Sequence, residues 1–367
     1  MRIRRTIQVP DPRRLRALAI GPLAALLLAS CSAYGPGTIE RDQMDYGLSL
    51  NTSIKQQLLA NIVRLRYMEA PLFVDVSSVI NQYSLSGNVQ AGVGFNNSFS
   101  SSNTGSLGAG GKWEDRPTIT YSPISGKKFA ESLLTPIPPE ALFALVQSGW
   151  PAELLFRLSV SSINGVEDAV ESPLYRKQAD PRYRETLSIW TRLRQQGALG
   201  LRRSTSETGN AIIVLYLRKT DTSEQTRQDI DTLRATLRLN PERNEFTLKY
   251  GLVPDSQNEL AVLTSSILDL MLDLAWQVDV PQPHVDEGRT ASTFVDTGLG
   301  GPLFTVYHSE DKPDAEYTYV AIQDRGYWYY IDDRDLVTKR TFGVLQILFS
   351  LTDAGEDARG PVVSIGG

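Results

Sequence analysis

The chain has 367 residues, of which 22% are charged, and its formal net charge is −5. This length and composition suit a globular protein of one or two domains with a substantial core. The first 31 residues carry six arginines and one aspartate, so the remaining residues have a net charge of −10. Because sequence-independent nucleic-acid binding requires a basic face, we expect no nucleic-acid partner. One cysteine and two histidines exclude an internal disulfide and a clustered zinc site.

Residues 1–30 have the three-part organisation of an export signal. Six arginines lie between positions 2 and 16, residues 17–29 form an apolar run broken only by Gly21 and Pro22, and small residues follow. A membrane-spanning helix needs about 20 apolar residues, so this run is too short to span a bilayer. The pattern therefore predicts a signal peptide over residues 1–30.

Cys31 follows Leu28, Ala29 and Ser30, and these four residues resemble the lipobox of bacterial lipoproteins. The resemblance implies cleavage before Cys31 and attachment of diacylglycerol to its thiol, with acyl chains such as palmitate. Each buried methylene contributes about 0.8 kcal/mol, so two or more acyl chains anchor a protein firmly. By the same resemblance, Ser32 in place of aspartate implies the outer membrane of a Gram-negative bacterium. The alternative, a soluble export signal with a chance cysteine, is disfavoured because the chain has no other cysteine.

The first mature residues are polar, and we expect residues 31–50 to be the lipidated cysteine and a tether. Ile54, Leu58, Ile62 and Leu65 then recur at helical spacing, and Pro71 ends that predicted helix. Residues 72–76 alternate as a strand. Residues 76–111 contain no charged residue, whereas a stretch of this length at 22% charge would contain about eight.

Within this uncharged stretch, apolar residues alternate with serine, glycine, asparagine and glutamine on both sides of a polar tip. The alternating apolar residues are Leu85, Val89, Ala91, Val93 and Phe95 on the first arm and Leu107, Ala109 and Trp113 on the second. A period of two predicts a long β-hairpin over residues 82–115. Transmembrane strands have about 9–11 residues with alternating faces, but two strands alone leave unpaired edges in lipid. The hairpin is therefore either one contribution to a barrel shared by several protomers, or a flexible Ser/Gly loop on the surface.

The following segments alternate between helical and strand patterns. We predict helices around residues 129–134, over 139–147 and from Asp180-Pro181 to Gly197, and a strand over 155–163. Residues 200–210 are polar, which predicts an N-terminal α+β domain over 51–200 and a C-terminal α+β domain over 205–367. Beyond this boundary we predict strand 211–217, helix 224–239, strands 245–250 and 260–264, and helix 267–277. The predicted class is α+β, with mixed or antiparallel sheets and packed helices.

The β-α-β-β-α order of residues 211–277 is similar to the ring-building modules of secretins and other envelope rings. This resemblance implies assembly, with other copies of the chain or with other envelope proteins. Fold alone does not determine function, and small α+β units serve many purposes.

The C-terminal part contains an aromatic run and an acidic run. We expect a loop over 281–302, strands over 303–308, 317–323 and 327–331, a hairpin turn at Asp324-Arg325-Gly326, and a helix from 336. Four consecutive residues could form an aromatic binding face, although alternate members of a strand face opposite sides, so half belong to the core: Tyr327, Trp328, Tyr329 and Tyr330.

The acidic run is Asp332, Asp333 and Asp335, which could bind a hard cation but more often would cap the next helix. We favour the cap. The sequence of residues 326–333 also resembles a family of bacterial proteins, and this resemblance implies no particular function.

No motif for catalysis is present. The sequence contains no G-x-S-x-G elbow, no G-x-x-x-x-G-K-[ST] loop and no H-E-x-x-H helix, and neither His284 nor His308 has a specified partner nucleophile. We expect no cofactor and no metal. The sequence favours a non-enzymatic, lipid-anchored assembly protein, ring-forming or pore-forming through its hairpin. The alternatives are a monomeric, periplasm-facing lipoprotein that binds a ligand or partner, and a carboxylate-based hydrolase of envelope polymers.

Overall fold

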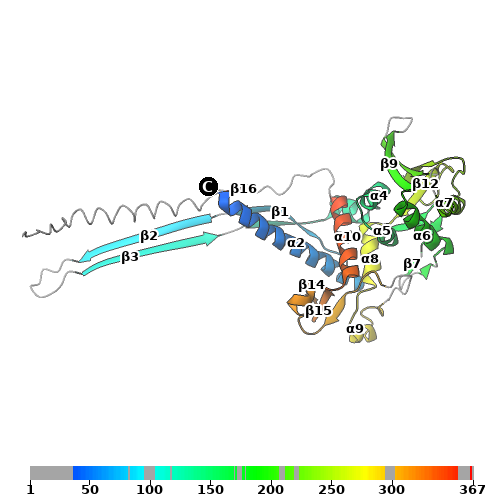
Figure 1. Cartoon of the computed structure of the whole chain (residues 1–367). Coiled ribbons are helices and arrows are strands. Elements are labelled where there is room, and N and C mark those ends of the chain that lie inside the picture. Colours follow the sequence, from blue (N-terminus) through cyan, green and yellow to red (C-terminus); the bar gives the residue numbers. More distant parts are fainter. Residues whose placement is uncertain are drawn as a thin grey trace, which may run out of the picture. The chain divides into compact units, whose positions relative to one another are not determined.

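The structure is a computed structural model in which part of the chain is described (Figure 1). The described residues are 36–81, 83–94, 104–115, 118–168, 170–171, 176–177, 179–205, 211–218, 223–293, 302–353 and 364–365. The predicted signal peptide, Leu28, Ala29, Ser30 and Cys31, together with Phe95 and the hairpin tip, lie outside them. The chain divides into two compact units, Met1–Gln56 and Gln57–Gly367.

Helix α2 (Pro36–Arg66) is longer than the sequence indicated. Residues 36–50, predicted to be an irregular tether, are helical. No proline follows Pro36 until Pro71, and proline is well tolerated in the first helical turn. Further along α2, the side-chain amides of Gln57 and Asn61 each accept a hydrogen bond from a backbone N–H and donate one to the carbonyl of the same residue, Val74 and Leu72 respectively. These bonds fix the extended segment that follows the helix.

That extended segment continues into paired strands. The four strands are β1 (Val74–Asn81), β2 (Tyr83–Gly94), β3 (Thr104–Asp115) and β4 (Thr118–Pro123). In Figure 1, β2 and β3 run side by side as a long antiparallel hairpin, which confirms the predicted hairpin. β4 pairs antiparallel with β1, and β16 (Ser364–Ile365) pairs parallel with β1 on its other side.

The largest sheet within the described ranges has six strands, in the order β6-β5-β12-β11-β10-β9. Their bounds are β5 (Val160–Ile163), β6 (Val166–Glu167), β9 (Leu199–Thr205), β10 (Ala211–Leu217), β11 (Glu245–Tyr250) and β12 (Glu259–Thr264). β11 and β12 are parallel, and the other pairs are antiparallel. β10, α7 (Glu224–Leu237), β11, β12 and α8 (Ile267–Ala275) confirm the predicted β-α-β-β-α unit. Strands from both sides of the predicted boundary at 200–205 thus belong to one sheet.

Three helices precede β9 in the chain after η2 (Ala130–Leu134), namely α4 (Pro139–Gln147), α5 (Ala152–Ser159) and α6 (Pro181–Gln195). Residues 155–159, predicted as strand, belong to α5. A short buried apolar run does not distinguish helix from strand by periodicity, and Pro151 opens the helix. The predicted cap of α6 is confirmed, because the Asp180 carboxylate accepts a hydrogen bond from the N–H of Arg182.

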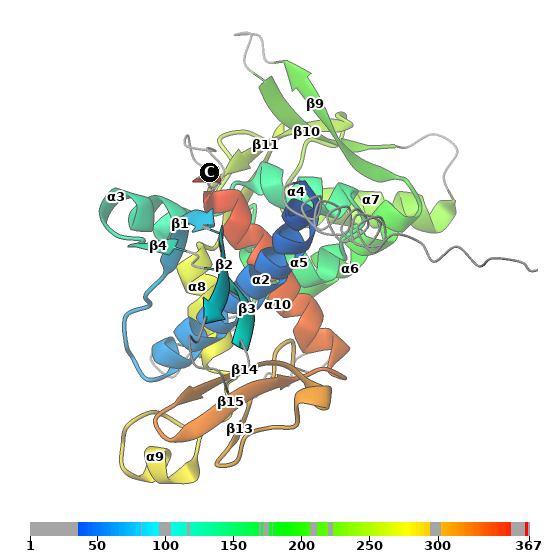
Figure 2. The ribbon, with the colours of Figure 1, turned by 90° about the vertical axis from the view of Figure 1, so that its left-hand side faces the viewer.

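The remaining elements include a three-stranded sheet in the order β13-β15-β14, seen beside α9 in Figure 2. Their bounds are α3 (Gly126–Phe129), π-helix η2 (Ala130–Leu134), β7 (Val170–Glu171), β8 (Arg176–Lys177), α9 (Gln282–Asp286), β13 (Tyr307–Ser309), 3-10 helix η3 (Ala315–Tyr317), β14 (Thr318–Asp324), β15 (Tyr327–Asp332) and α10 (Leu336–Asp353). The predicted loop 281–302 therefore contains a helix, and the predicted strand 303–308 is shorter and later. The α+β class is confirmed.

Candidate functional site

The register of β2 and β3 places the predicted membrane positions on one side of the hairpin. Directly opposed positions in an antiparallel pair lie on the same face. The opposed pairs on this apolar face are Leu85 with Trp113, Gly87 with Gly111, Val89 with Ala109, Ala91 with Leu107, Val93 with Gly105 and, at the end of the ladder, Tyr83 with Asp115. All the predicted apolar positions in the described part of the hairpin are therefore brought together.

The other side, the polar face, carries hydroxyl, amide and glycine positions and, at one end, the charged Lys112 and Glu114. Its pairs are Ser84 with Glu114, Ser86 with Lys112, Asn88 with Gly110, Gln90 with Gly108, Gly92 with Ser106, and Gly94 with Thr104. Asn88 and Gln90 are exposed to solvent. The hairpin is thus amphipathic across its thickness, as a strand pair between lipid and water would be.

The same register extends into the neighbouring pair of strands. From Ser78 opposite Thr120 to Ile80 opposite Thr118, β1 and β4 follow the offset that β2 and β3 follow; the register shifts only between Val76 and Ser78. The two-residue alternation is therefore in phase across both ladders. Charged positions in β2 and β3 are confined to the end nearest β4, at Lys112, Glu114 and Asp115.

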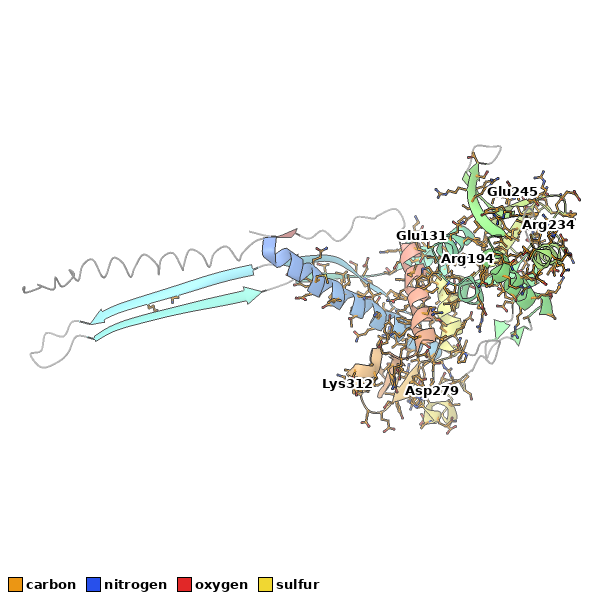
Figure 3. All side chains as sticks on the ribbon, viewed as in Figure 1. Glu131, Arg194, Arg234, Glu245, Asp279 and Lys312 are labelled. Carbon is orange, nitrogen blue, oxygen red and sulfur yellow. The ribbon has the colours of Figure 1, made fainter. Side chains whose placement is uncertain are left out.

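The aromatic run occupies β15, the central strand of the three-stranded sheet. Tyr329 is fully buried, and Tyr327, which shares its face, packs against the core. Trp328 and Tyr330 lie on the opposite face, where the Lys312 ammonium lies 5.6 Å from the Trp328 ring and Tyr330 contacts the half-exposed Tyr307. Figure 3 labels Lys312 at this sheet. As predicted from the alternation of a strand, half of the run belongs to the core, and Trp328 and Tyr330 are the members left for a binding face.

A buried chain of hydrogen bonds lies on the inner side of this sheet. The Tyr67 hydroxyl is 2.7 Å from Nδ1 of His284 and 2.7 Å from the Tyr329 hydroxyl. Tyr67, His284 and Tyr329 are 7%, 5% and 0% exposed, so the chain is shielded from water. Burial and the neighbouring Arg289 hold the pKa of His284 below its usual value, partly offset by Glu287. Sequence reasoning singled out both His284 and Tyr329 but not Tyr67, because nothing local distinguishes that tyrosine.

Two arginines enclose the same centre. Arg66 is fully buried and donates hydrogen bonds to the carbonyls of Val278 and Ala291 and to the Thr290 hydroxyl. The Arg325 guanidinium lies 4.3 Å from the Tyr67 ring centroid and pairs with Glu69. Buried charges require this kind of complete hydrogen bonding. No local sequence signal marks Arg66 as a core residue.

The second histidine borders this centre. Nδ1 of His308 lies 2.9 Å from a carboxylate oxygen of Asp279, which Figure 3 labels. The Tyr327 ring contacts both histidine rings, at centroid distances of 5.3 Å to His284 and 5.9 Å to His308. The two histidines of the chain, 24 positions apart in sequence, therefore both contact the ring of one tyrosine.

The acidic run is engaged in local structure. The Asp335 carboxylate accepts hydrogen bonds from the N–H groups of Val337 and Thr338, which confirms the predicted cap of α10. Asp332 accepts two hydrogen bonds from the Arg334 guanidinium, and Asp333 pairs with Lys339. Across the described ranges, no group of three or more His, Cys, Asp or Glu residues could hold a metal ion.

One carboxyl group has a strongly displaced pKa. Desolvation by the surrounding protein raises the pKa of the Asp273 carboxyl and Asp269 and Asp168 add to the rise, but water reaches this exposed residue on α8 and limits the desolvation. The Asp269 carboxylate is committed to the capping box of α8 with Ser266. A carboxylic acid with a raised pKa suits proton donation, which is the chemistry that the hydrolase alternative requires.

The comparisons with known proteins add no identity. No family model, no curated protein and no solved structure matches the chain. Within the part of the chain that the structure describes, no helix combines the length and apolar character required to cross a membrane. The features of the chain that bear on function are the hairpin, the aromatic sheet and the sequence of the N-terminus.

Proposed function

We propose that the chain is a lipid-anchored, non-enzymatic assembly protein of a Gram-negative outer membrane, whose hairpin joins those of other copies in a membrane barrel. The observation that carries the proposal is the register of β2 and β3, which gathers the apolar positions on one face and the polar positions on the other. A strand pair needs this division when lipid lies on one side and water on the other.

The length of the uncharged part agrees with a bilayer. Residues 85–94 of β2 extend about 33 Å at about 3.3 Å per residue, and a 45° tilt reduces this to about 23 Å of depth. Outer-membrane barrels have an apolar band about 25 Å tall, flanked by aromatic residues. Trp113, opposite Leu85, is at the position where such a band would end, and Asp115 lies just beyond it.

A hairpin in lipid must have partners at both edges. The described residues place β2 and β3 in a sheet of two strands, so each strand has one unpaired edge. Exposed backbone groups in lipid cost several kcal/mol each, which makes a closed barrel the stable form. A barrel of about eight strands would need about four copies and would be filled by side chains, whereas an aqueous channel of about 16–18 strands would need eight or nine.

The lipid anchor supports this location. Cys31 lies outside the described residues, and its role comes from the lipobox resemblance of Leu28, Ala29 and Ser30. An acylated cysteine would hold the protein at a membrane while copies assemble. The partners of the chain would then be membrane lipid and further copies of itself or other envelope proteins.

The test compares adjacent positions on the two faces. Gln90→Cys and Ala91→Cys are made separately, since the lipidated Cys31 leaves no competing thiol, and each is labelled with a polarity-sensitive fluorophore in liposomes. We expect a blue-shifted emission, quenched by brominated lipid, from position 91, and a water-like emission, quenched by iodide, from position 90. Equal water-like emission from both positions, with a monomeric mass in detergent, would refute the barrel.

A second candidate function is favoured by the outer side of the aromatic sheet. Trp328 and Tyr330, with the half-exposed Tyr307, could bind a ligand or partner of a monomeric lipoprotein. Deletion of residues 84–112 separates the two functions. The monomeric function requires that folding and binding are unchanged, whereas the barrel function requires that assembly is lost.

A further inference from the structure

The buried chain of Tyr329, Tyr67 and His284 connects three separate elements. Tyr67 directly follows α2, His284 belongs to α9, and Tyr329 belongs to β15. Both oxygen-to-partner distances are 2.7 Å, and the three residues are nearly inaccessible to water. Exchange of a proton at any member therefore affects the contact of all three elements.

Counting hydrogens gives this chain a preferred direction. When His284 is neutral with its hydrogen on Nε2, Nδ1 accepts from the Tyr67 hydroxyl, and Tyr67 accepts from the Tyr329 hydroxyl. Every hydroxyl hydrogen then has an acceptor. When His284 is protonated, Nδ1 must donate to Tyr67, Tyr67 must donate to Tyr329, and the Tyr329 hydrogen needs another acceptor. Among the described residues the only hydrogen-bond partner of the Tyr329 hydroxyl is Tyr67, so its hydrogen is left buried without one.

The surrounding charges also oppose a proton on His284. Arg325 lies over Tyr67, Arg289 follows α9, and both disfavour a charged imidazole. His308, beyond Tyr327 and bonded to Asp279, adds to this effect when it is protonated. Glu287 acts in the opposite direction, and Glu69 is paired with Arg325. Asp324 also lies near the Arg325 guanidinium. Burial, Arg289, Arg325 and His308 together outweigh Glu287, so the pKa of His284 lies below its usual value.

We propose that Tyr329, Tyr67 and His284 form a pH-sensitive latch, closed while His284 is neutral and opened when His284 takes up a proton. Opening separates α9 and the Arg325-Gly326 turn from the end of α2. The opening is confined to these elements, because Arg66 stays charged whether or not His284 is protonated and continues to donate hydrogen bonds to the carbonyls of Val278 and Ala291. The latch is independent of the proposed barrel.

The test uses the two histidines of the full chain as two reporters. Histidine-selective NMR labelling of the detergent-solubilised protein gives two titrating signals, and His308→Gln identifies which belongs to His284. We expect His284 to titrate below the 6.5 of free histidine. Amide exchange in residues 282–288 and 325–331, corrected for the intrinsic rate, should accelerate by up to tenfold for each pH unit below 6.5 until the pKa of His284 in the folded protein is reached.

Variants separate a latch from simple packing. His284→Asn should abolish the acid-induced acceleration, whereas the matched control His308→Gln should retain it. Tyr329→Phe makes Tyr67 the last hydroxyl of the chain, so protonation of His284 would leave the Tyr67 hydrogen without an acceptor, and the pKa of His284 should stay below 6.5 in this variant even if His284→Asn fails to fold. Titration of His284 at or above 6.5, or loss of the acceleration in His308→Gln but not in His284→Asn, would overturn the proposal.

Discussion

Arginine substitution on the two faces of the hairpin gives the most direct measure of membrane insertion. Val89, opposite Ala109, is the central pair between the pair of Leu85 with Trp113 and the pair of Val93 with Gly105. It is therefore about 13 Å along the strand from either end of the apolar face. Gln90 is the next residue, on the polar face. Val89→Arg and Gln90→Arg add the same charge to the same strand at nearly the same depth.

The expected penalties differ because only one position meets lipid. An arginine at the bilayer midplane of a barrel costs about 2–4 kcal/mol per copy. This corresponds to a reduction of about 30-fold to 800-fold in the insertion equilibrium of each copy, and the reductions multiply around a ring. Arginine at position 90 would lie in the aqueous interior, where the cost in lipid does not apply.

Liposome flotation measures the difference. Both substitutions are made together with Cys31→Ala, so that the hairpin, rather than the acyl chains, determines membrane association. We expect the Gln90→Arg protein to float with the liposomes after a urea wash and the Val89→Arg protein to remain at the bottom of the gradient. The assignment of the apolar face to lipid is wrong if both proteins float equally. It is also wrong if neither variant floats and the protein with Cys31→Ala alone does not float either.

Further predictions concern the fold and the anchor. Asn164→Ala should lower the melting temperature by about 5 °C, because it removes the side-chain hydrogen bonds to the backbone of Ala261 and Leu237 and places an alanine at a positive φ. Asn164→Gly should lower the melting temperature less, because glycine adopts a positive φ without strain. Asp335→Ala removes the cap of α10 and should lower the free energy of unfolding, measured by chemical denaturation, by about 1 kcal/mol; Asp335→Asn should keep most of this stabilisation. Below pH 6.5, stability should fall as the pH decreases, because the pKa of His284 is lower in the folded than in the unfolded protein; His284→Asn should flatten this dependence. Cys31→Ala alone should leave the protein in the membrane fraction, because the hairpin also holds it there; release into the soluble fraction would show that lipid is the only anchor.

Local chemistry was predictable where a single residue type settles the backbone. The hairpin turn predicted at Asp324-Arg325-Gly326 is confirmed: Asp324 pairs with Tyr327, and the two residues between them, Arg325 and Gly326, both have positive φ. Asn164 and Gly165, which join β5 to β6 with positive φ, carry the same kind of signal. The turn at Asn164 and Gly165 is hard to recognise in the sequence, because the apolar run before it, which forms α5, also matches a strand over residues 155–159.

The buried centre could not be predicted from the sequence. Tyr67 is 217 positions from His284 and 262 from Tyr329, so no local spacing relates them. The first half of α2 was missed for a different reason. Met44 and Leu48 are exposed, and the apolar pattern that predicts a helix starts only at Ile54, one turn before the buried Leu58.

The short strand β16 has a consequence for how copies of the hairpin can meet. At Ile80, β1 has β16 on one side and β4 on the other, so its backbone there has no free edge for a third strand. Open strand edges invite pairing with any neighbouring chain, and natural proteins cover them. If copies pair along the hairpin from its tip, this covered part of β1 would end the pairing just past Tyr83. The ladder shared between copies would then contain only β2 and β3, and the β1–β4 pairs of neighbouring copies would not pair with one another.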